Sequence, residues 1–282
     1  MAKPTGPTSH DIVDMVRRAL GEQRVGHLGT LDPFAEGLLV VVVGRATRLA
    51  AFAAGWTKAY DGVIRLGVTT DTDDATGAVL RTETMEVTAA QLAAALAQFR
   101  GGYEQRPPAY SAVKIAGERA YRRARRGEVV EPAARRVEVE QLELMEFAFP
   151  EVRFRATVGG GTYLRSLARD IGAALGCGGH LRALRRTAVG PLSLAEAVAP
   201  EALTAAHVRD PAVLVAHLQR REASMAERES VVHGRPIARD PVPAQSFRDT
   251  RDPVALFSGS ELLAVAEVEG DLLKPRVVVT DA

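Results

Sequence analysis

The sequence predicts a fold that combines α-helices with β-strands, followed by a small β-rich part at the C-terminus. Apolar residues recur at three- and four-residue spacing in residues 9–20 and 162–176, which predicts two amphipathic helices. Apolar and polar residues alternate in residues 57–66, which predicts a strand with one buried face. Near the C-terminus, residues 262–267 and 276–279 have the composition of short strands separated by turns.

Size and composition predict a cytoplasmic globular protein of one large domain or two. Of the 282 residues, 46% are hydrophobic and 25% are charged, and the N-terminus lacks the apolar core of a secretory signal. No apolar stretch approaches the ~18 residues of a membrane span. The single cysteine, Cys177, excludes an internal disulfide and a multi-cysteine metal site. The polar stretch 219–230 predicts a boundary, which we place between domains 1–221 and 222–282.

The first elements have predictable ends. We expect Ser9 to cap the first helix and Gly21 to end it. The apolar run 38–43 predicts a strand that is buried on both faces. Residues 44–54 predict a short amphipathic helix.

The middle of the chain predicts further helices and strands. Thr88 and Gln91 have the spacing of a capping box in front of an apolar helix. Residues 118–126 predict a basic helix, and residues 136–147 and 152–158 predict two strands.

The loop around Asp32 predicts a carboxylate that is held in one direction. Pro33 pushes Asp32 toward extended geometry, and Gly29 and Gly37 allow backbone conformations that other residues resist. A solvated surface aspartate does not need this framing, although an ordinary Asp-Pro turn would contain the same residues. The pattern favours a carboxylate that is aimed at a reacting group.

The second amphipathic helix carries a possible partner for that carboxylate. With Thr162 as the N-cap, Arg165 falls in the first helical turn, where a cation opposes the helix dipole. This small cost indicates an anionic partner elsewhere, and Asp32 is a candidate. A solvated surface arginine is the alternative interpretation.

Three other polar patterns do not predict a cofactor or a metal. The spacing of Asp71, Asp73 and Asp74 does not fit a calcium-binding loop. Residues 159–162 lack the signatures of a phosphate-binding loop and of a dinucleotide fold. The six histidines form no pair at metal-binding spacing, so we expect no cofactor and no metal.

The basic residues cluster, although the net charge is only +1. Lysine occupies four positions, so 32 of the 36 basic residues are arginine. Clustered arginines can follow a phosphate backbone, and a general preference for arginine is the alternative explanation. The clustered residues are Arg119, Arg122, Arg123, Arg125, Arg126, Arg135, Arg136, Arg182, Arg185 and Arg186.

Seven motifs in order resemble those of the TruB family, the bacterial tRNA pseudouridine synthases. Together they cover most of the first two hundred residues, with departures at Leu28, Glu36 and Gly160. The motifs are Lys3-Pro4-x-Gly6-x-Thr8-Ser9-x-Asp11, Gly26-His27-x-Gly29-Thr30-Leu31-Asp32-Pro33 with Gly37, Lys58-Ala59-Tyr60, Leu66-Gly67-x-x-Thr70-Asp71-Thr72-x-Asp74, Pro107-x-x-Tyr110-Ser111-Ala112-x-Lys114, Gly161-Thr162-Tyr163-x-Arg165 and Leu184-Arg185-Arg186.

The resemblance implies an α+β fold, namely a pseudouridine synthase core with a mixed, largely antiparallel sheet and a small C-terminal PUA-like domain that binds RNA. It implies an enzyme that isomerises the uridine at position 55 in the T loop of tRNA to pseudouridine, without a cofactor. The partner would be the T stem-loop, with the target base flipped out of it. Nothing in the sequence indicates a dimer seam or a membrane partner, so we expect a monomer.

The resemblance also implies catalytic roles for three residues. Asp32 would act on the sugar carbon C1′, either by covalent addition or by stabilising positive charge, and routes through C6 or a glycal stay open. Arg165 would pair with Asp32, favour its charged form and fix its direction. Tyr60 would stack on the uracil and could serve as base or relay for the C5 proton.

Further residues would bind the substrate. His27 would enter the space that the flipped base leaves, Tyr163 would pack beside the pocket, and Leu184 would form an apolar wall. Lys3 and Lys114 would hold phosphates together with the arginine clusters. Tyr110 completes the set of expected binding residues.

Two other functions fit part of the pattern. An RNA chaperone that binds the T arm without chemistry would explain the arginines, but a carboxylate on a rigid loop would repel phosphate. A glycoside hydrolase normally needs two carboxylates and has no use for the basic clusters.

Overall fold

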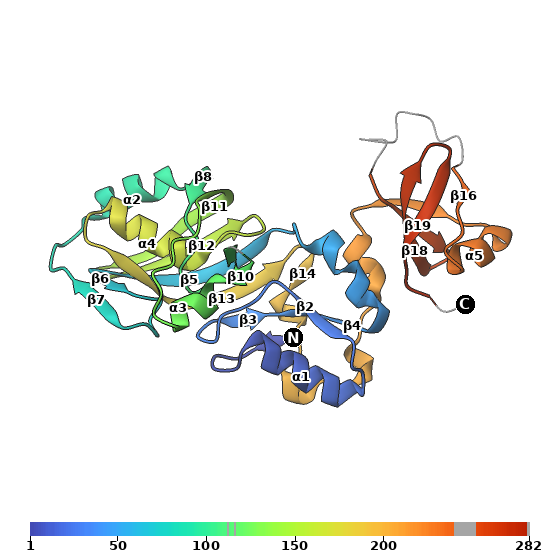
Figure 1. The fold of residues 1–282 in the computed structure, drawn as a ribbon. Helices are drawn as coiled ribbons and strands as arrows, with labels where there is room; N and C mark the ends of the chain where they lie inside the picture. Colours follow the sequence, from blue (N-terminus) through green and yellow to red (C-terminus); the bar gives the residue numbers. More distant parts are fainter. Residues whose placement is uncertain (112, 116, 240–251, 281–282) are drawn as a thin grey trace. The chain divides into compact units, whose positions relative to one another are not determined.

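The chain divides into two compact units, and each unit is assembled from several segments of the sequence (Figure 1). The computed structural model describes residues 1–111, 113–115, 117–239 and 252–280. Unit 1 contains Met1–His10, Thr30–Leu39 and Gly55–Ala199, and unit 2 contains Asp11–Gly29, Val40–Ala54 and Pro200–Ala282. The domain boundary expected between residues 221 and 222 stays a prediction.

Unit 1 is built on a mixed sheet of eight strands in the order β1-β3-β13-β5-β12-β11-β8, with β14 paired to β13. Between these described strands, β13 and β3 run parallel and the other pairs are antiparallel. This confirms the predicted α+β class with a largely antiparallel sheet. The strands predicted at 57–66, 136–147 and 152–158 are present as β5, β11 and β12. The strands are β1 (Ala2–Lys3), β3 (Glu36–Leu38), β5 (Lys58–Leu66), β8 (Gly101–Gln105), β11 (Arg135–Ala148), β12 (Glu151–Val158), β13 (Gly179–Val189) and β14 (Leu192–Ser193).

Two helices pack against this sheet. Helix α4 (Leu164–Ala174) contacts β13, and α2 (Ala89–Gln98) contacts α4 and β11 (Figure 1). Helix α2 begins with the expected capping box, because the Thr88 side chain accepts from the Gln91 N–H and the Gln91 side chain accepts from the Thr88 N–H. The sheet and the two helices hold the buried core of unit 1.

The start of α4 differs from the prediction by one residue. Tyr163, and not Thr162, occupies the N-cap position, and no side chain caps the helix there. The Thr162 hydroxyl instead donates to the Glu138 carbonyl over 3.4 Å. Arg165 still lies in the first turn, and the apolar residues beside it, Leu164 and Leu167, are buried as expected.

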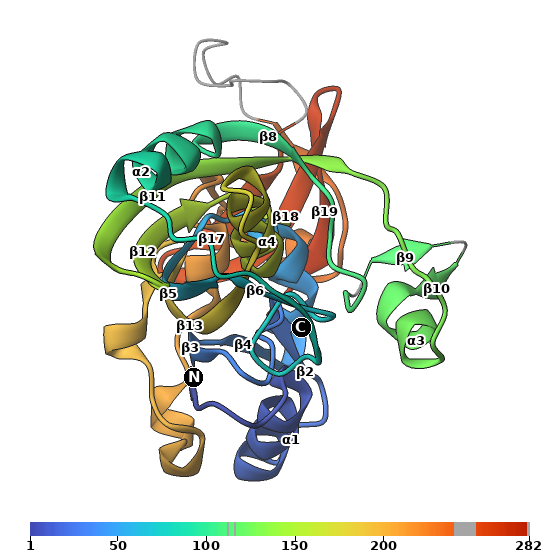
Figure 2. The ribbon, with the colours of Figure 1, turned by 90° about the vertical axis from the view of Figure 1, so that its left-hand side faces the viewer.

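Smaller elements flank the sheet of unit 1. Strands β6 (Val68–Thr70) and β7 (Val79–Thr82) form one pair, and β9 (Lys114–Ile115) and β10 (Glu118–Arg119) form another. The second pair leads into α3 (Ala120–Arg125), which is the predicted basic helix, and together they project from the sheet (Figure 2). A short 3₁₀-helix, η2 (Leu194–Glu196), follows β14.

The apolar run 38–43 forms two strands instead of the one predicted. Strand β3 ends at Leu38, and β4 (Val40–Val43) pairs with β2 (Val25–Leu28) in unit 2. Leu39, which is fully buried, separates them and exchanges backbone hydrogen bonds with Met1. An uninterrupted apolar run satisfies the burial demands of both sheets, so its composition does not reveal where the chain changes sheet.

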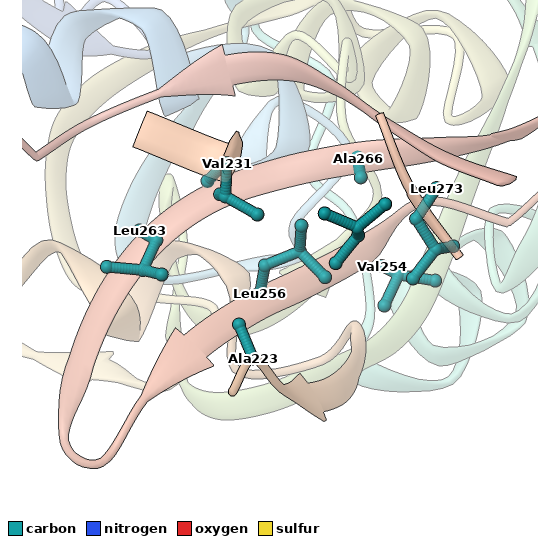
Figure 3. Packing of buried hydrophobic residues seen from close by; sticks show 9 residues of the cluster. Ala223, Val231, Val254, Leu256, Leu263, Ala266 and Leu273 are labelled. Atoms are coloured by element: carbon teal, nitrogen blue, oxygen red, sulfur yellow. The ribbon is translucent and has the colours of Figure 1, made fainter. Parts of the chain in front are cut away.

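Unit 2 contains the β-rich C-terminal part. Five strands lie in the order β15-β17-β18-β19-β16, and helix α5 packs on them through Val231, which lies in one buried cluster with Leu256 and Leu263 (Figure 3). Helix α1 ends before Gly21, as predicted, but it already includes Ser9, which we expected to be the N-cap residue in front of it. The elements are α1 (Ser9–Leu20), η1 (Gly44–Ala53), η3 (Pro200–Ala202), η4 (Ala205–His207), η5 (Pro211–Val215), β15 (Gln219–Glu222), α5 (Met225–Val232), β16 (Ile237–Ala238), β17 (Val254–Ser258), β18 (Glu261–Glu269) and β19 (Leu272–Val278).

The polar stretch 219–230, which we expected to mark a domain boundary, forms regular secondary structure. It forms β15 and most of α5, and Ala223 and Val231 supply apolar anchors around it. The stretch is polar because β15 and α5 bury few side chains, so sparse apolar periodicity does not imply an unstructured segment.

Candidate functional site

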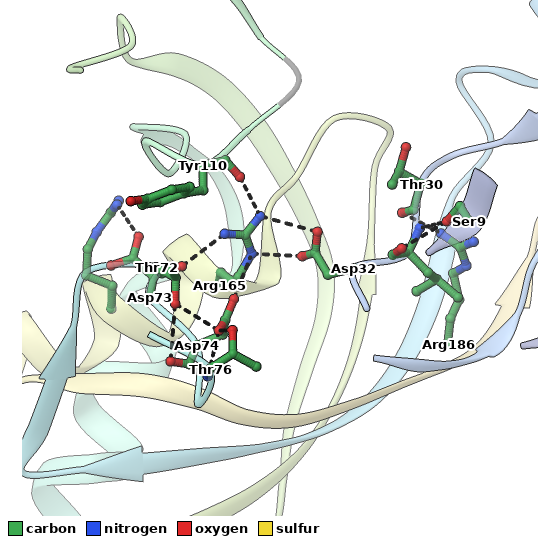
Figure 4. Close-up of polar contacts among 12 residues, drawn as sticks. Ser9, Thr30, Asp32, Thr72, Asp73, Asp74, Thr76, Tyr110, Arg165 and Arg186 are labelled. Carbon is green, nitrogen blue, oxygen red and sulfur yellow. Dashed lines mark hydrogen bonds and ion pairs between the residues drawn. The ribbon is translucent and has the colours of Figure 1, made fainter. Parts of the chain in front are cut away.

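Arg165 and Asp32 form a close ion pair in unit 1 (Figure 4). The Arg165 Nε donates to Asp32 Oδ2 over 2.8 Å, and Nη2 donates to Oδ1 over 3.4 Å. The arginine side chain is 6% exposed, whereas the Asp32 side chain is 34% exposed. The expected pairing is therefore present, with a buried cation and a carboxylate that remains accessible to a ligand.

Two backbone carbonyls hold the Arg165 guanidinium in place. Nη1 donates to the Thr72 carbonyl and Nη2 donates to the Tyr110 carbonyl, each over 2.9 Å (Figure 4). The guanidinium is planar, so donors engaged on three different segments fix its orientation. Asp32 therefore pairs with a guanidinium whose orientation is already fixed by its other hydrogen bonds.

Asp74 is a further acidic residue of this site, and the sequence reasoning assigned it no chemistry. Its Oδ2 lies 3.7 Å from Arg165 Nε, and its side chain is 6% exposed. Asp74 Oδ1 accepts hydrogen bonds from the Thr72 hydroxyl and from the N–H and hydroxyl of Thr76. The available signal was the spacing Thr72-x-Asp74-x-Thr76, because these two threonines are the hydrogen-bond donors to the Asp74 carboxylate.

A second Arg–Asp pair lies one helical turn further along α4. Arg169 Nη1 donates to Asp73 Oδ2 over 2.9 Å, and its Nη2 donates to the Arg106 carbonyl. Burial raises the pKa of Asp73, although the Arg169 charge and hydrogen bond act in the opposite direction. The loop that binds Arg165 is thus bound to the same helix at two successive turns.

The Asp32 loop is anchored by two side chains from the first ten residues. Ser9 Oγ donates to the Leu31 carbonyl and accepts from the Leu31 N–H, both over 2.9 Å, in place of the expected capping role. Lys3 Nζ donates to the carbonyls of Ala35 and Pro33 over 2.7 and 3.4 Å. The Lys3 side chain is buried, so its ammonium supports the loop and does not present itself to a phosphate, contrary to our expectation.

Tyr60 lies on β5 and is 6% exposed. Burial raises the pKa of its hydroxyl, and the Asp32 charge acts in the same direction, while the charge and hydrogen bond of Arg186 partly oppose the shift. A phenol with a raised pKa is neutral near pH 7. Tyr60 can therefore relay a proton or pack against a base, but its hydroxyl does not carry a negative charge at neutral pH.

The other expected binding residues occupy different places. Leu184 is buried on β13, and Tyr110 packs with the apolar residues beneath α3. Tyr163 lies under the Arg135 guanidinium, whose carbon is 5.1 Å from the ring centre. Lys114 is exposed on β9, and His27, half-buried on β2, belongs to unit 2.

Several of the clustered arginines bind glutamates of the same chain. In the described part of the chain, Arg123 and Arg126 both pair with Glu128, and Arg126 also pairs with Glu118. Arg182 pairs with Glu151, and Arg185 lies 3.6 Å from Glu36. Arg186 is 1% exposed, so it is not a surface phosphate contact. Arg119 and Arg122 are exposed and remain candidates for that role.

Two searches of the described residues gave negative results. No helix there is long and apolar enough to cross a membrane. Within those same ranges, no three histidine, cysteine or acidic side chains are grouped as metal ligands would be.

Comparisons with known proteins match the chain along most of its length. Residues 17–164 match the family model described as TruB family pseudouridylate synthase, N-terminal domain, and residues 165–225 match tRNA pseudouridylate synthase B, C-terminal domain. The chain is 45% identical to tRNA pseudouridine synthase B of Thermobifida fusca (strain YX), over 98% of this chain and 96% of that protein. It is 41% identical to the protein of the same name from Azoarcus sp. (strain BH72), over 98% and 92% of the two chains.

A solved structure shares the fold. In the archaeal box H/ACA sRNP Nop10–Cbf5 complex, one chain superimposes with a TM-score of 0.72 at 24% identity, over 99% of this chain and 85% of that chain. This likeness extends to the fold alone.

Proposed function

The chain belongs to the TruB family of pseudouridylate synthases, and from this we propose that it isomerises uridine 55, in the T loop of tRNA, to pseudouridine. The observation that carries the proposal is the Asp32–Arg165 pair, in which a partly exposed carboxylate is held by a buried guanidinium. A carboxylate fixed in this way suits chemistry at an anomeric carbon.

The reaction breaks the bond between N1 and C1′ and forms a bond between C5 and C1′. Asp32 either adds to C1′ as the uracil leaves or stabilises positive charge there, and addition at C6 is a further route. The uracil then turns, C5 bonds to C1′, and the proton on C5 departs while N1 gains one. The product is an isomer of the substrate, so neither an oxidant nor water is consumed.

Arg165 and Tyr60 assist this reaction in different ways. Arg165 stabilises the charged carboxylate and holds it toward the sugar, with support from the Thr72 and Tyr110 carbonyls. Tyr60 packs against the uracil and relays the C5 proton, which is compatible with a neutral phenol.

Substrate binding requires the uridine to leave the folded T loop. His27 occupies the space that the base vacates, while Leu184 and Tyr163 pack beside the flipped nucleotide. Lys114 and the exposed arginines contact phosphates and supply affinity without sequence information. Lys3 supports the Asp32 loop instead.

The protein acts as a monomer in the cytoplasm, and its β-rich C-terminal part, 222–282, serves as a PUA-like RNA-binding domain. Specificity comes mainly from the shape of the T arm.

Release of tritium from a T-arm hairpin that carries C5-labelled uridine tests the proposal. We expect release by the wild type, near-complete loss of release by Asp32→Asn, and unchanged RNA binding by that variant. Asp61→Asn is the matched control, because Asp61 is an exposed aspartate on β5 that pairs with Arg155. RNA binding by the wild type without tritium release would instead support the T-arm-binding chaperone.

A further inference from the structure

Arg186 is a buried arginine between the strand that carries Tyr60 and the strand that follows the Asp32 loop. It is 1% exposed on β13, opposite Tyr60 of β5 and opposite Gly37 of β3. Burying a guanidinium costs free energy unless its donors find acceptors, and an apolar side chain of similar size would be buried at lower cost. The contacts of Arg186 therefore explain why a cation occupies this position.

Arg186 joins the two ends of the Asp32 loop. Its Nε donates to the Leu38 carbonyl over 2.7 Å. Its Nη1 donates to the Thr30 carbonyl over 3.5 Å (Figure 4). Thr30 precedes Asp32 in the chain and Leu38 follows it. One rigid, planar group thus sets the separation of the two segments from which the loop projects.

The same guanidinium acts on Tyr60. Its charge and a side-chain hydrogen bond both lower the pKa of the Tyr60 hydroxyl, against the larger opposing effect of burial. Arg186 therefore contacts the loop that carries the carboxylate as well as the phenol, whereas Arg165 contacts the carboxylate itself.

We propose that Arg186 is a positioning residue of the reaction, which holds the Asp32 loop and the Tyr60 hydroxyl in one fixed arrangement without touching the substrate. The proposal rests on the functions proposed above for Asp32 and Tyr60. Lysine would keep the positive charge but not the planar group that reaches two carbonyls and a phenol at once.

The first test compares Arg186→Met and Arg186→Lys in single-turnover pseudouridine formation at saturating enzyme. We expect Arg186→Met to lower the rate about 100-fold, because a small displacement of reacting groups costs about that much, with RNA affinity within about threefold of the wild type. Arg186→Lys should recover part of the rate. Arg155→Met, which removes an exposed arginine from β12 of the same sheet, is the control. A wild-type rate in Arg186→Lys and Arg186→Met would overturn the proposal.

A second test separates positioning from simple structural support. Each Arg186 variant is combined with Tyr60→Phe, and circular dichroism confirms that the variants are folded. If Arg186 acts partly through the Tyr60 hydroxyl, the Arg186 substitution costs less rate in the Tyr60→Phe background than in the wild type. Equal losses in both backgrounds would overturn this part of the proposal.

A third test does not depend on activity. Tyrosine labelled with ¹³C at Cζ gives a signal for Tyr60 that Tyr60→Phe assigns. We expect Arg186→Met, or Arg186→Lys if the methionine variant does not fold, to shift this signal, while Arg155→Met leaves it in place. In the methionine variant, ionisation of Tyr60 should also begin at higher pH. An unmoved signal would refute the link between Arg186 and Tyr60, whereas an inactive wild type with a moved signal would refute only the proposed function.

Discussion

Arg165 Nε and Asp32 Oδ2 lie 2.8 Å apart, although 133 positions separate the two residues in the chain. The carboxylate comes from the loop before β3, and the guanidinium comes from the first turn of α4. Asp74 Oδ2 lies 3.7 Å from the same Nε, so one buried guanidinium interacts with two carboxylates. Removal of that cation would leave two carboxylates without their shared partner, which makes Arg165 the most sensitive member of the group.

Replacement of Arg165 by methionine should abolish most of the turnover. Truncating one partner of a buried, hydrogen-bonded charge pair typically costs about 2–5 kcal/mol, which corresponds to a loss of roughly 30-fold or more in rate. Single-turnover kinetics and RNA titrations measure the rate and the affinity separately, with Arg155→Met as the control. A loss of RNA affinity with an unchanged rate would contradict the pairing role.

Tyr60→Phe should retain RNA binding and lose about 100-fold in rate, because proton transfer by a positioned group contributes at least that much. Because burial raises the pKa of Tyr60, its proton is present throughout pH 6 to 9. The wild-type rate should therefore show no fall in that range that depends on Tyr60. A pH–rate profile of both proteins checks this, and a falling limb near pH 8 that Tyr60→Phe removes would contradict it.

Gly37→Ala should destabilise unit 1 by more than Gly6→Ala does. Both glycines have strongly positive φ angles, +109° and +112°, so both substitutions strain the backbone. A Cβ at Gly37 would lie 2.3 Å from the Arg186 carbonyl oxygen, whereas at Gly6 it would meet nothing within 4 Å. We expect Gly37→Ala to cost about 2 kcal/mol more in urea unfolding, since overpacking adds about 1–3 kcal/mol to the strain. Equal losses of stability in the two variants would contradict this, because they would show that β3 and β13 can move apart at little cost.

Glu227→Gln should lower the stability of unit 2 only at pH values at which the Glu227 carboxylate is ionised. The hydrogen bond from Arg221 and those from Ser224 lower the pKa of Glu227 to about 2. Because this pKa lies below the usual value of 4.5 for the unfolded chain, the ionised group stabilises the fold above about pH 4.5, and the contribution disappears as the pH falls toward 2.

Thermal unfolding at several pH values measures this effect. At pH 7 the glutamine variant should lose about 1 kcal/mol, the usual value of a helix cap, and the difference from the wild type should shrink between pH 4.5 and 2. Glu229→Gln on the same helix is the exposed control. A difference that is the same at pH 3 and pH 7 would contradict the ionisation argument.

Lys114 and Arg122 should each contribute to RNA affinity through a phosphate. Both side chains are exposed in the segment 114–122, next to arginines that bind glutamates. Lys114→Ala and Arg122→Ala should each weaken binding and reduce the slope of log affinity against log salt by about 1. Arg155→Ala should leave the slope unchanged. A slope that neither substitution alters would place the phosphate contacts elsewhere.

Patterns within single elements predicted much of the fold. Periodicity located α1 and α4, alternation located β5, and the spacing of Thr88 and Gln91 predicted a capping box that is present. The error in the apolar run 38–43 arose because one local pattern fits two structures, and the run is divided between β3 and β4. The polar stretch 219–230 shows that sparse apolar residues do not imply an unstructured segment, because it forms β15 and most of α5.

The sequence by itself determined the family and most of the elements, because motifs and periodicity are local properties of the chain, and it named Asp32 as a candidate partner of Arg165. Only the tertiary structure decided how Lys3, Asp74 and Arg186 are used. Each could have been a solvated charge, but the packing of distant strands and loops buries all three against backbone carbonyls or other charges. Burial depends on what the rest of the chain places around a residue, and no spacing along the sequence contains that information.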